Sequence, residues 1–171
     1  MIKTIVFDLD NTLYWMGPFD RPGVTDDDPE YKKFLQTRRL SEENKEILDI
    51  LKKQYRLFII NYENSNWRFN TKKAVFQLDD YFETVWQGTK NVNKIDIIKV
   101  ITKQFKADEI LVIGDKKHDE IFAGNVLGCH TVQIMIGRHS TAPIEFPNEK
   151  PDFQINNLSE IFDVLKKLNS E

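Results

Sequence analysis

Apolar residues along the chain form short continuous runs that alternate with longer stretches of helical spacing. The continuous runs end at polar residues, and they predict strands at 4–9, 56–61, 83–86, 109–115 and 131–136. Runs of Val, Ile, Leu and Phe without polar alternation are typical of strands covered on both faces, and therefore of parallel sheets. We predict a mainly parallel, five-stranded sheet.

Helical spacing of apolar residues fills the intervals between these runs. It predicts helices at 42–53, 67–76, 93–105, 118–127 and 158–168. Ser41 is a favourable N-cap for the first of them, and Gly128 is a favourable terminator for the fourth. Alternating strands and helices with crossovers of this length indicate a Rossmann-like, three-layer α/β/α sandwich. We expect one such domain over residues 1–171.

The interval from Trp15 to Leu40 interrupts the alternation. It contains three prolines, two glycines and the acidic run at 26–28. Residues that break helices and strands at this density predict a loop, with at most one helical turn near 31–36. Long loops in compact domains are usually functional or disordered. We therefore interpret residues 14–40 as an insertion loop or flap.

Composition narrows the possible partners and compartment. A net charge of −3 and a pI near 5.7 give no bulk-charge signal for nucleic acid or anionic membranes. The single cysteine, Cys129, cannot form an internal disulfide and fits a reducing compartment. No apolar run approaches the ~18 residues of a membrane span, and the N-terminus lacks a signal-peptide pattern. We expect a cytoplasmic globular protein without a membrane partner.

Polar side chains follow four of the predicted strands, at the sheet edge where open parallel sheets form their sites. In chain order they are Asp8, Asp10 and Thr12, then Asn61, then Lys90, then Asp115 and Asp119. Strand alternation would point Asp8 and Asp10 the same way, about 7 Å apart. If Asp115 joins them, like charges at about 4 Å repel by roughly 4 kcal/mol at an effective dielectric of about 20. A divalent cation would remove that cost, and oxygen-only ligation with open positions indicates Mg²⁺.

The remaining polar groups suit a phosphoryl group. Lys90 would add positive charge, and Asn61 and Thr12 could donate hydrogen bonds to phosphate oxygens. Asp8 would attack phosphorus and form an aspartyl-phosphate. Asp10 would protonate the leaving oxygen and then deprotonate the hydrolytic water. These residues predict a phosphatase acting on a phosphorylated substrate.

Two segments resemble motifs of the haloacid dehalogenase (HAD) superfamily of phosphohydrolases. "DLDNTL" at 8–13 resembles its first motif, "IGDKKHD" at 113–119 resembles its fourth, and Lys90 lies where the third-motif lysine belongs. The resemblance implies a HAD-like fold with Asp8 as nucleophile and Asp10 as acid–base. Members that cleave carbon–halogen bonds lack the second aspartate, so Asp10 favours phosphoryl transfer.

The resemblance also implies a ligand set for Mg²⁺. The Asp8 carboxylate, the Asp10 backbone carbonyl and Asp115 would bind the ion directly. Asp119 would contribute through a water molecule or an outer contact. Thr12 would mainly shape the loop around the nucleophile.

Two features depart from the family pattern. Asn61 stands where the second motif normally has Ser or Thr, and only the 14–40 flap stands in place of the usual cap domain. The chain therefore resembles the small, capless or minimally capped members, of the magnesium-dependent phosphatase type. An open site would admit a bulky, macromolecular substrate such as a phosphoprotein or a nucleic-acid end.

Other functions stay open from the sequence. The substitution at Asn61 also suits a catalytically weak or inactive binding or regulatory module on the same fold. A phospho-acceptor receiver domain would use similar residue types, but its acceptor follows the third strand and its acidic pair the first. This chain does not have that order.

Overall fold

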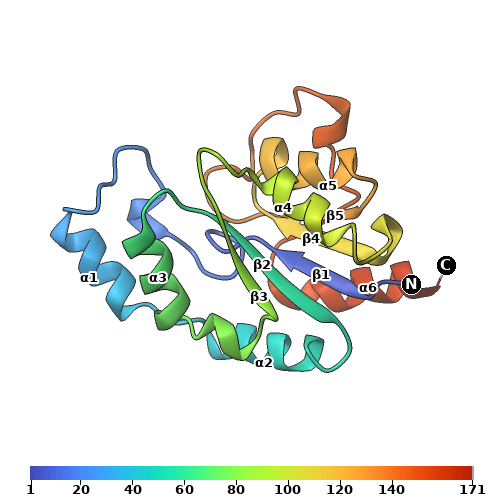
Figure 1. The fold of residues 1–171 in the computed structure, drawn as a ribbon, viewed down its shortest axis with the longest axis horizontal. Coiled ribbons are helices and arrows are strands. Elements are labelled where there is room, and N and C mark those ends of the chain that lie inside the picture. The colour runs from blue at the N-terminus through green and yellow to red at the C-terminus, as the bar shows by residue number, and fades with distance from the viewer. Residues whose placement is uncertain (171) are drawn as a thin grey trace.

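A six-stranded sheet forms the centre of the computed structural model, which describes residues 1–170 (Figure 1). Its strands are β1 Thr4–Phe7, β2 Arg56–Tyr62, β3 Thr84–Gly88, β4 Ile110–Gly114, β5 His130–Ile134 and β6 Phe153–Ile155. All neighbours pair in parallel in the order β3-β2-β1-β4-β5-β6. The α/β fold with a parallel sheet is confirmed, but the predicted count of five strands was wrong. The missed strand, β6, spans only three residues, too few to form a recognisable apolar run.

Helices cover both faces of this sheet. They are α1 Pro29–Thr37, α2 Glu42–Leu51, α3 Asn66–Val75, α4 Lys94–Ile101, α5 Phe122–Val126 and α6 Ile161–Ser170. A π-helical turn, Lys117–Ile121, leads into α5. In Figure 1, α2 and α6 lie on one face of the sheet, and α4 and α5 lie on the other. Ser41 caps α2 as expected, because its Oγ accepts from the Asn44 N–H at 3.1 Å.

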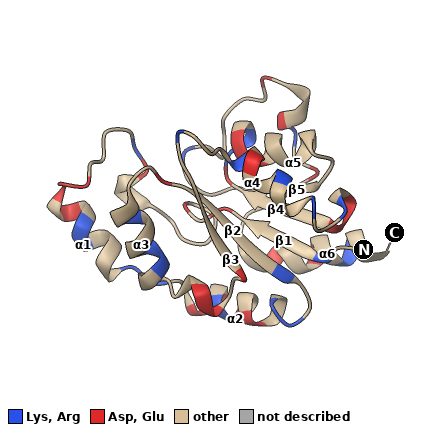
Figure 2. Cartoon of the chain, viewed as in Figure 1, with Lys and Arg blue, Asp and Glu red and all other residues tan. Residues whose placement is uncertain are grey.

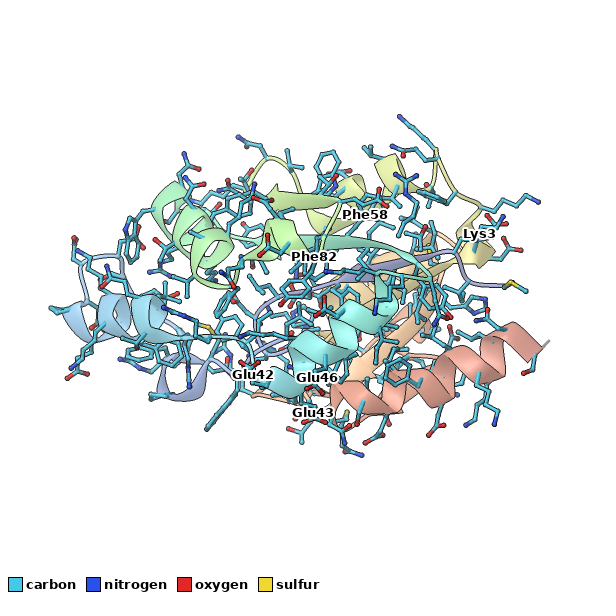
Figure 3. All side chains as sticks on the ribbon, turned by 90° about the horizontal axis from the view of Figure 1, so that it is seen from below. Lys3, Glu42, Glu43, Glu46, Phe58 and Phe82 are labelled. Atoms are coloured by element: carbon cyan, nitrogen blue, oxygen red, sulfur yellow. The ribbon has the colours of Figure 1, made fainter. Side chains whose placement is uncertain are left out.

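Each face of the sheet has its own apolar core, because successive residues of a strand point to opposite faces. Phe7 of β1 joins the core shared with α2 and α6, and Val6 joins the core shared with α4 and α5. Phe82 belongs to the first of these cores and Phe58 to the second, and both are labelled in Figure 3. Strand β1 is buried along its whole length. Because β1 is the third of the six strands, its carboxyl end lies near the middle of the sheet edge.

Residues 15–40 contain more regular structure than the sequence indicated. The segment forms a short 3₁₀ turn, Gly17–Phe19, and the nine-residue helix α1 instead of a loop with one helical turn. The acidic run and proline were misinterpreted as loop signals. The Asp28 side chain accepts from the backbone N–H groups of Glu30 and Tyr31, and Pro29 occupies the first helical position, where its missing N–H costs nothing. Helix α1 packs against α3 (Figure 1).

Surface charges of both signs are interspersed over the helices and loops, as Figure 2 shows.

Within residues 1–170, none of the helices combines the length and apolarity that crossing a bilayer requires.

Candidate active site

The chain turns sharply just after the two aspartates of the first motif, at residues 11–13. The strand ends at Phe7, and Asn11 adopts a left-handed conformation with φ of 57°. The Asn11 side chain accepts from the Met16 N–H at 3.0 Å and so ties the loop together. Lysines from two different helices, α4 and α3, hold the Asp8 and Asp10 carboxylates. That the two side chains point the same way stays a prediction.

Asp8 lies in a buried cluster with Lys94, Asp115 and Glu120, which we call the Asp8 site. Lys94 is 1% exposed and donates to Asp8 Oδ1 at 2.7 Å and to Glu120. Carboxylate oxygens of the three acids lie within 4.8 Å of one another. Lys94 thus pairs with two of these buried carboxylates, those of Asp8 and Glu120, and not with Asp115. Negative charge is in excess, and a further cation would be bound favourably here.

Asp115 is the least satisfied member of the Asp8 site. It is fully buried, and within the described residues neither of its carboxylate oxygens has a hydrogen-bond partner. Burial, together with the negative charge of Asp8, raises the pKa of the Asp115 carboxyl to about 7. A buried acceptor without a donor costs free energy. Oxygen ligands of this kind suit Mg²⁺, so the residues present fit a divalent cation.

Glu120 belongs to the Asp8 site, but the sequence did not single it out. Its carboxylate is fully buried and accepts from Lys94 and from the Lys116 N–H at 3.2 Å. A Cβ atom on Gly114 would lie 2.7 Å from Glu120 Cγ, so the glycine of the fourth motif makes room for this side chain. Because its oxygens already have donors, Glu120 is a weaker candidate ligand than Asp115. Asp119, the predicted outer ligand, is partly exposed and lies 3.3 Å from Lys94 Nζ.

Lys94, and not Lys90, is the lysine that contacts Asp8. Lys90 is exposed in the loop between β3 and α4, where its backbone N–H donates to Asn64. The expected placement of Lys90 was therefore wrong. Asn93 caps α4, which puts Lys94 in the first turn, on the same face as Ile97 and Ile98. That apolar face packs on the sheet and carries the lysine inward.

Two predicted phosphate-binding residues lie at neighbouring strand ends. The Thr12 hydroxyl is 3.5 Å from Asp8 Oδ2, which is a weak contact. Asn61, near the end of β2, is 2% exposed, and its Nδ2 has no hydrogen-bond partner within residues 1–170. An unpaired buried donor is unusual. It gives the end of β2 an N–H group that is available to an anion.

Asp10 lies in a second cluster with Lys72, Glu63 and Tyr14, which we call the Asp10 site. Lys72 donates to Asp10 Oδ2 at 2.6 Å and to Glu63 at 3.1 Å, while the Tyr14 hydroxyl donates to Asp10 Oδ1 at 2.5 Å. Burial alone would raise the pKa of the Asp10 carboxyl, but Lys72 and Tyr14 outweigh it and lower the pKa below its usual value. Asp10 is therefore ionised in the free protein. The sequence had not indicated Lys72 or Glu63 as contacts of Asp10.

One family model and one relative of known activity match this chain in sequence. Residues 92–161 match the model of the HAD-hydrolase-like family. A glyceraldehyde 3-phosphate phosphatase from Pyrococcus furiosus is 28% identical over 145 residues, which cover 80% of this chain. The chain matches only 58% of the length of that relative.

Solved structures share the fold at low sequence identity. YfnB from Bacillus subtilis, a HAD-hydrolase described as bound to magnesium, has a TM-score of 0.70 at 16% identity, covering 96% of this chain and 98% of the other. A 2-haloacid dehalogenase from Pseudomonas syringae has a TM-score of 0.71 at 18% identity, covering 98% and 99%. Likenesses at this identity establish the fold alone.

Proposed function

We propose that this chain is a magnesium-dependent phosphatase of the haloacid dehalogenase (HAD) superfamily of hydrolases, a proposal supported by the match of residues 92–161 to the HAD-hydrolase-like family and by the phosphatase relative. It would hydrolyse a phosphate monoester through an aspartyl-phosphate on Asp8. The observation that carries this proposal is the pair of unpartnered oxygens on buried Asp115 beside the Asp8 carboxylate. The free oxygens of Asp115 suit a cation. Asp8, held by Lys94 beside them, is placed to act on a phosphoryl group bound to that cation.

The first half of the reaction forms the covalent intermediate. An oxygen of Asp8 attacks phosphorus, and the bond from phosphorus to the ester oxygen breaks. Asp10 gives its proton to that departing oxygen, so the product leaves as an alcohol. Asp10 is ionised in the free protein, but the negative charge of a bound phosphoryl group raises its pKa and favours the protonated form.

The second half returns the enzyme to its starting state. Asp10, now ionised, takes a proton from a water molecule as the water oxygen attacks phosphorus. The bond between phosphorus and Asp8 breaks, which releases phosphate and leaves the Asp8 carboxylate free. Lys94 stays within 2.7 Å of Asp8 Oδ1 and offsets the charge on this carboxylate before attack and after release.

Mg²⁺ would be held by the carboxylates of Asp8 and Asp115 and by the Asp10 backbone carbonyl, with Asp119 contributing through an outer contact. When bound, the ion supplies positive charge for the phosphoryl oxygens. Asn61 and Thr12 would donate hydrogen bonds to the same group.

We propose a small phosphorylated molecule as the substrate. The curated relative is a phosphatase of glyceraldehyde 3-phosphate by name. Residues 15–40 also form α1 and a small apolar cluster of their own, centred on Phe19, Tyr31 and Leu35. An ordered segment next to the site favours a compact ligand over the macromolecular substrate that an open site would suit.

The alternative is a non-hydrolytic module that binds phosphate esters without turning them over. Assay of para-nitrophenyl phosphate with Mg²⁺ and with EDTA separates the two, with glyceraldehyde 3-phosphate as a second substrate. We expect phosphate release that requires Mg²⁺, disappears in Asp8→Asn and persists in Asp163→Asn, a matched change of an exposed acid on α6. Absence of turnover in the wild type, or turnover that survives Asp8→Asn, would refute the proposal.

A further inference from the structure

We propose that Lys72 is a positioning residue that fixes the Asp10 carboxylate for proton transfer. This inference rests on the proposed function, since it assumes that Asp10 carries the proton. Lys72 would act only through Asp10. Its ammonium group is buried between two carboxylates and has no described contact with Asp8, Asp115 or Lys94.

The contacts around Asp10 fix both of its carboxylate oxygens. Lys72 Nζ lies 2.6 Å from Oδ2, and the Tyr14 hydroxyl lies 2.5 Å from Oδ1. Two anchors on different oxygens stop the carboxylate from rotating about its terminal bond. Each carboxylate oxygen can accept more than one hydrogen bond. Asp10 can therefore be held in place and still exchange a proton with a leaving group or a water molecule.

Burial makes these contacts more than an incidental surface ion pair. The Lys72 side chain is 1% exposed, whereas the Asp10 side chain keeps 25% of its surface accessible. The lysine thus approaches from inside the protein and leaves an open side of Asp10 toward solvent or substrate. Glu63, directly after β2, holds the same ammonium group at 3.1 Å and fixes it from the second side. Exchange of partners by Lys72 is restricted by this arrangement.

The helix that carries Lys72 is also attached to the 15–40 segment. At the start of α3, Ser65 and Arg68 donate to Asp26, and Arg68 donates to the Val24 carbonyl at 2.7 Å. Further along, α3 packs against α1. Lys72 therefore connects the proton-transfer group to the segment that lies next to the site. A shift of that segment would change the orientation of Asp10.

Kinetics of Lys72→Met test the proposal, with Lys73→Met as the matched control. Lys73 is the next residue of α3, is 36% exposed and pairs with Asp79. We expect Lys72→Met to lower kcat by about 10- to 100-fold, less than the roughly 100- to 10,000-fold that general acid–base catalysis supplies because Asp10 itself stays, with KM changed less than about twofold. Lys73→Met should keep wild-type values of both constants.

A leaving-group comparison separates positioning from a general structural role. Nitrophenolate departs without a proton, whereas the oxygen of glycerol 3-phosphate needs one. Lys72→Met should therefore lower kcat/KM more for glycerol 3-phosphate than for para-nitrophenyl phosphate. Equal losses on the two substrates would overturn the proposal, because loosened packing would affect both alike.

A second variant covers the case in which Lys72→Met does not fold. Lys72→Met with Glu63→Gln removes one cation and one acid, so less unpaired charge stays buried. We expect this double variant to fold and to keep the low kcat. Recovery of wild-type kcat would show that Lys72 only neutralises Glu63, and would overturn the proposal. A wild-type chain without phosphatase activity would overturn the proposed function as well, whereas an active wild type with equally active Lys72→Met overturns this inference alone.

Discussion

The Asp8 site and the Asp10 site each contain an aspartate, a lysine and a glutamate, but the pKa of the aspartate is raised in one and lowered in the other. In each, a lysine that is 1% exposed bonds to an aspartate of the first motif and to a glutamate. Burial and the neighbouring acids raise the pKa values of Asp8 and Asp115, while Lys72 and Tyr14 lower that of Asp10 against the effect of burial. The difference lies in the number of acids near each lysine and in the hydroxyl contact, which is 2.5 Å from Tyr14 to Asp10 but 3.5 Å from Thr12 to Asp8.

This contrast explains how two carboxylates of one short loop can have different tasks. The Asp8 site has unpaired acceptors and excess negative charge, which suit a cation and a nucleophile. The Asp10 site has every oxygen of its aspartate engaged, which suits an acid–base group held in one orientation. Removing the lysine, an acid or the bound cation of one site should therefore affect stability and activity differently from the same change in the other site.

The largest effect is expected for Lys94→Met. It leaves the buried carboxylates of Asp8 and Glu120 without their ammonium group, and removing one partner of a buried pair costs about 3–5 kcal/mol. Urea denaturation in metal-free buffer at neutral pH measures this loss. Lys99→Met on the exposed side of α4 is the control and should cost less than about 0.5 kcal/mol. A loss no larger for Lys94→Met than for Lys99→Met would contradict the charge balance described for the Asp8 site.

The next effect is a pH dependence that belongs to Asp115. Its pKa rises from 3.8 to about 7 on folding, so the folded state binds a proton more tightly than the unfolded state. Without metal, its contribution to stability is present in acid and is lost as the pH rises from about 4 to about 7, by an amount on the order of 4 kcal/mol. Asp115→Asn removes this titration. The stability difference between Asp115→Asn and wild type should therefore grow over that interval and stay level above it, and a constant difference would contradict the prediction.

A smaller effect is expected from Mg²⁺ itself. At neutral pH, a free ion concentration of about 100 times its dissociation constant should stabilise the wild type by about 2.7 kcal/mol, because it binds the folded state. Thermal unfolding with Mg²⁺ and with EDTA measures the shift. Asp115→Asn should lose most of it, and Lys72→Met should keep it, because Lys72 lies in the Asp10 site. Equal shifts in both variants would remove the distinction between the two sites.

The smallest effect is expected for Lys90→Met. The Lys90 side chain is exposed, whereas Lys94 contacts Asp8. Stability should change by less than about 0.5 kcal/mol, as is usual for a surface substitution, and kcat should stay near its wild-type value. A large loss of kcat in this variant would restore Lys90 as the functional lysine.

The sequence predicted the layers of the fold well because its strands are short and almost entirely apolar. Five strands and the capped helix after Ser41 follow from local patterns that tertiary contacts reinforce. Strand β6 was missed because it is very short. Helix α1 was missed because Asp28 and Pro29 serve equally well as loop residues and as a helix start.

The first-motif aspartates and Asp115 could be found from their positions at strand ends, but their partners could not. Lys94 and Lys72 are buried because each shares a helix face with apolar residues three or four positions later, Ile97 and Ile98 for one and Val75 and Phe76 for the other. This signal was present in the sequence. Which carboxylate each lysine would meet depends on how α3 and α4 pack beside β1, which local spacing does not reveal. Glu120 depended on the space beside Gly114, which sequence spacing does not reveal.

Chemical trapping of the intermediate tests the division of tasks between Asp8 and Asp10 most directly. The wild type, mixed with para-nitrophenyl phosphate and Mg²⁺, is quenched with borohydride, which reduces an aspartyl-phosphate to homoserine. Peptide mass spectrometry then locates the reduced residue. We predict homoserine at position 8 alone, and none without substrate. Homoserine at position 10, or active turnover with aspartate intact at position 8, would contradict the assignment of Asp8 as the nucleophile.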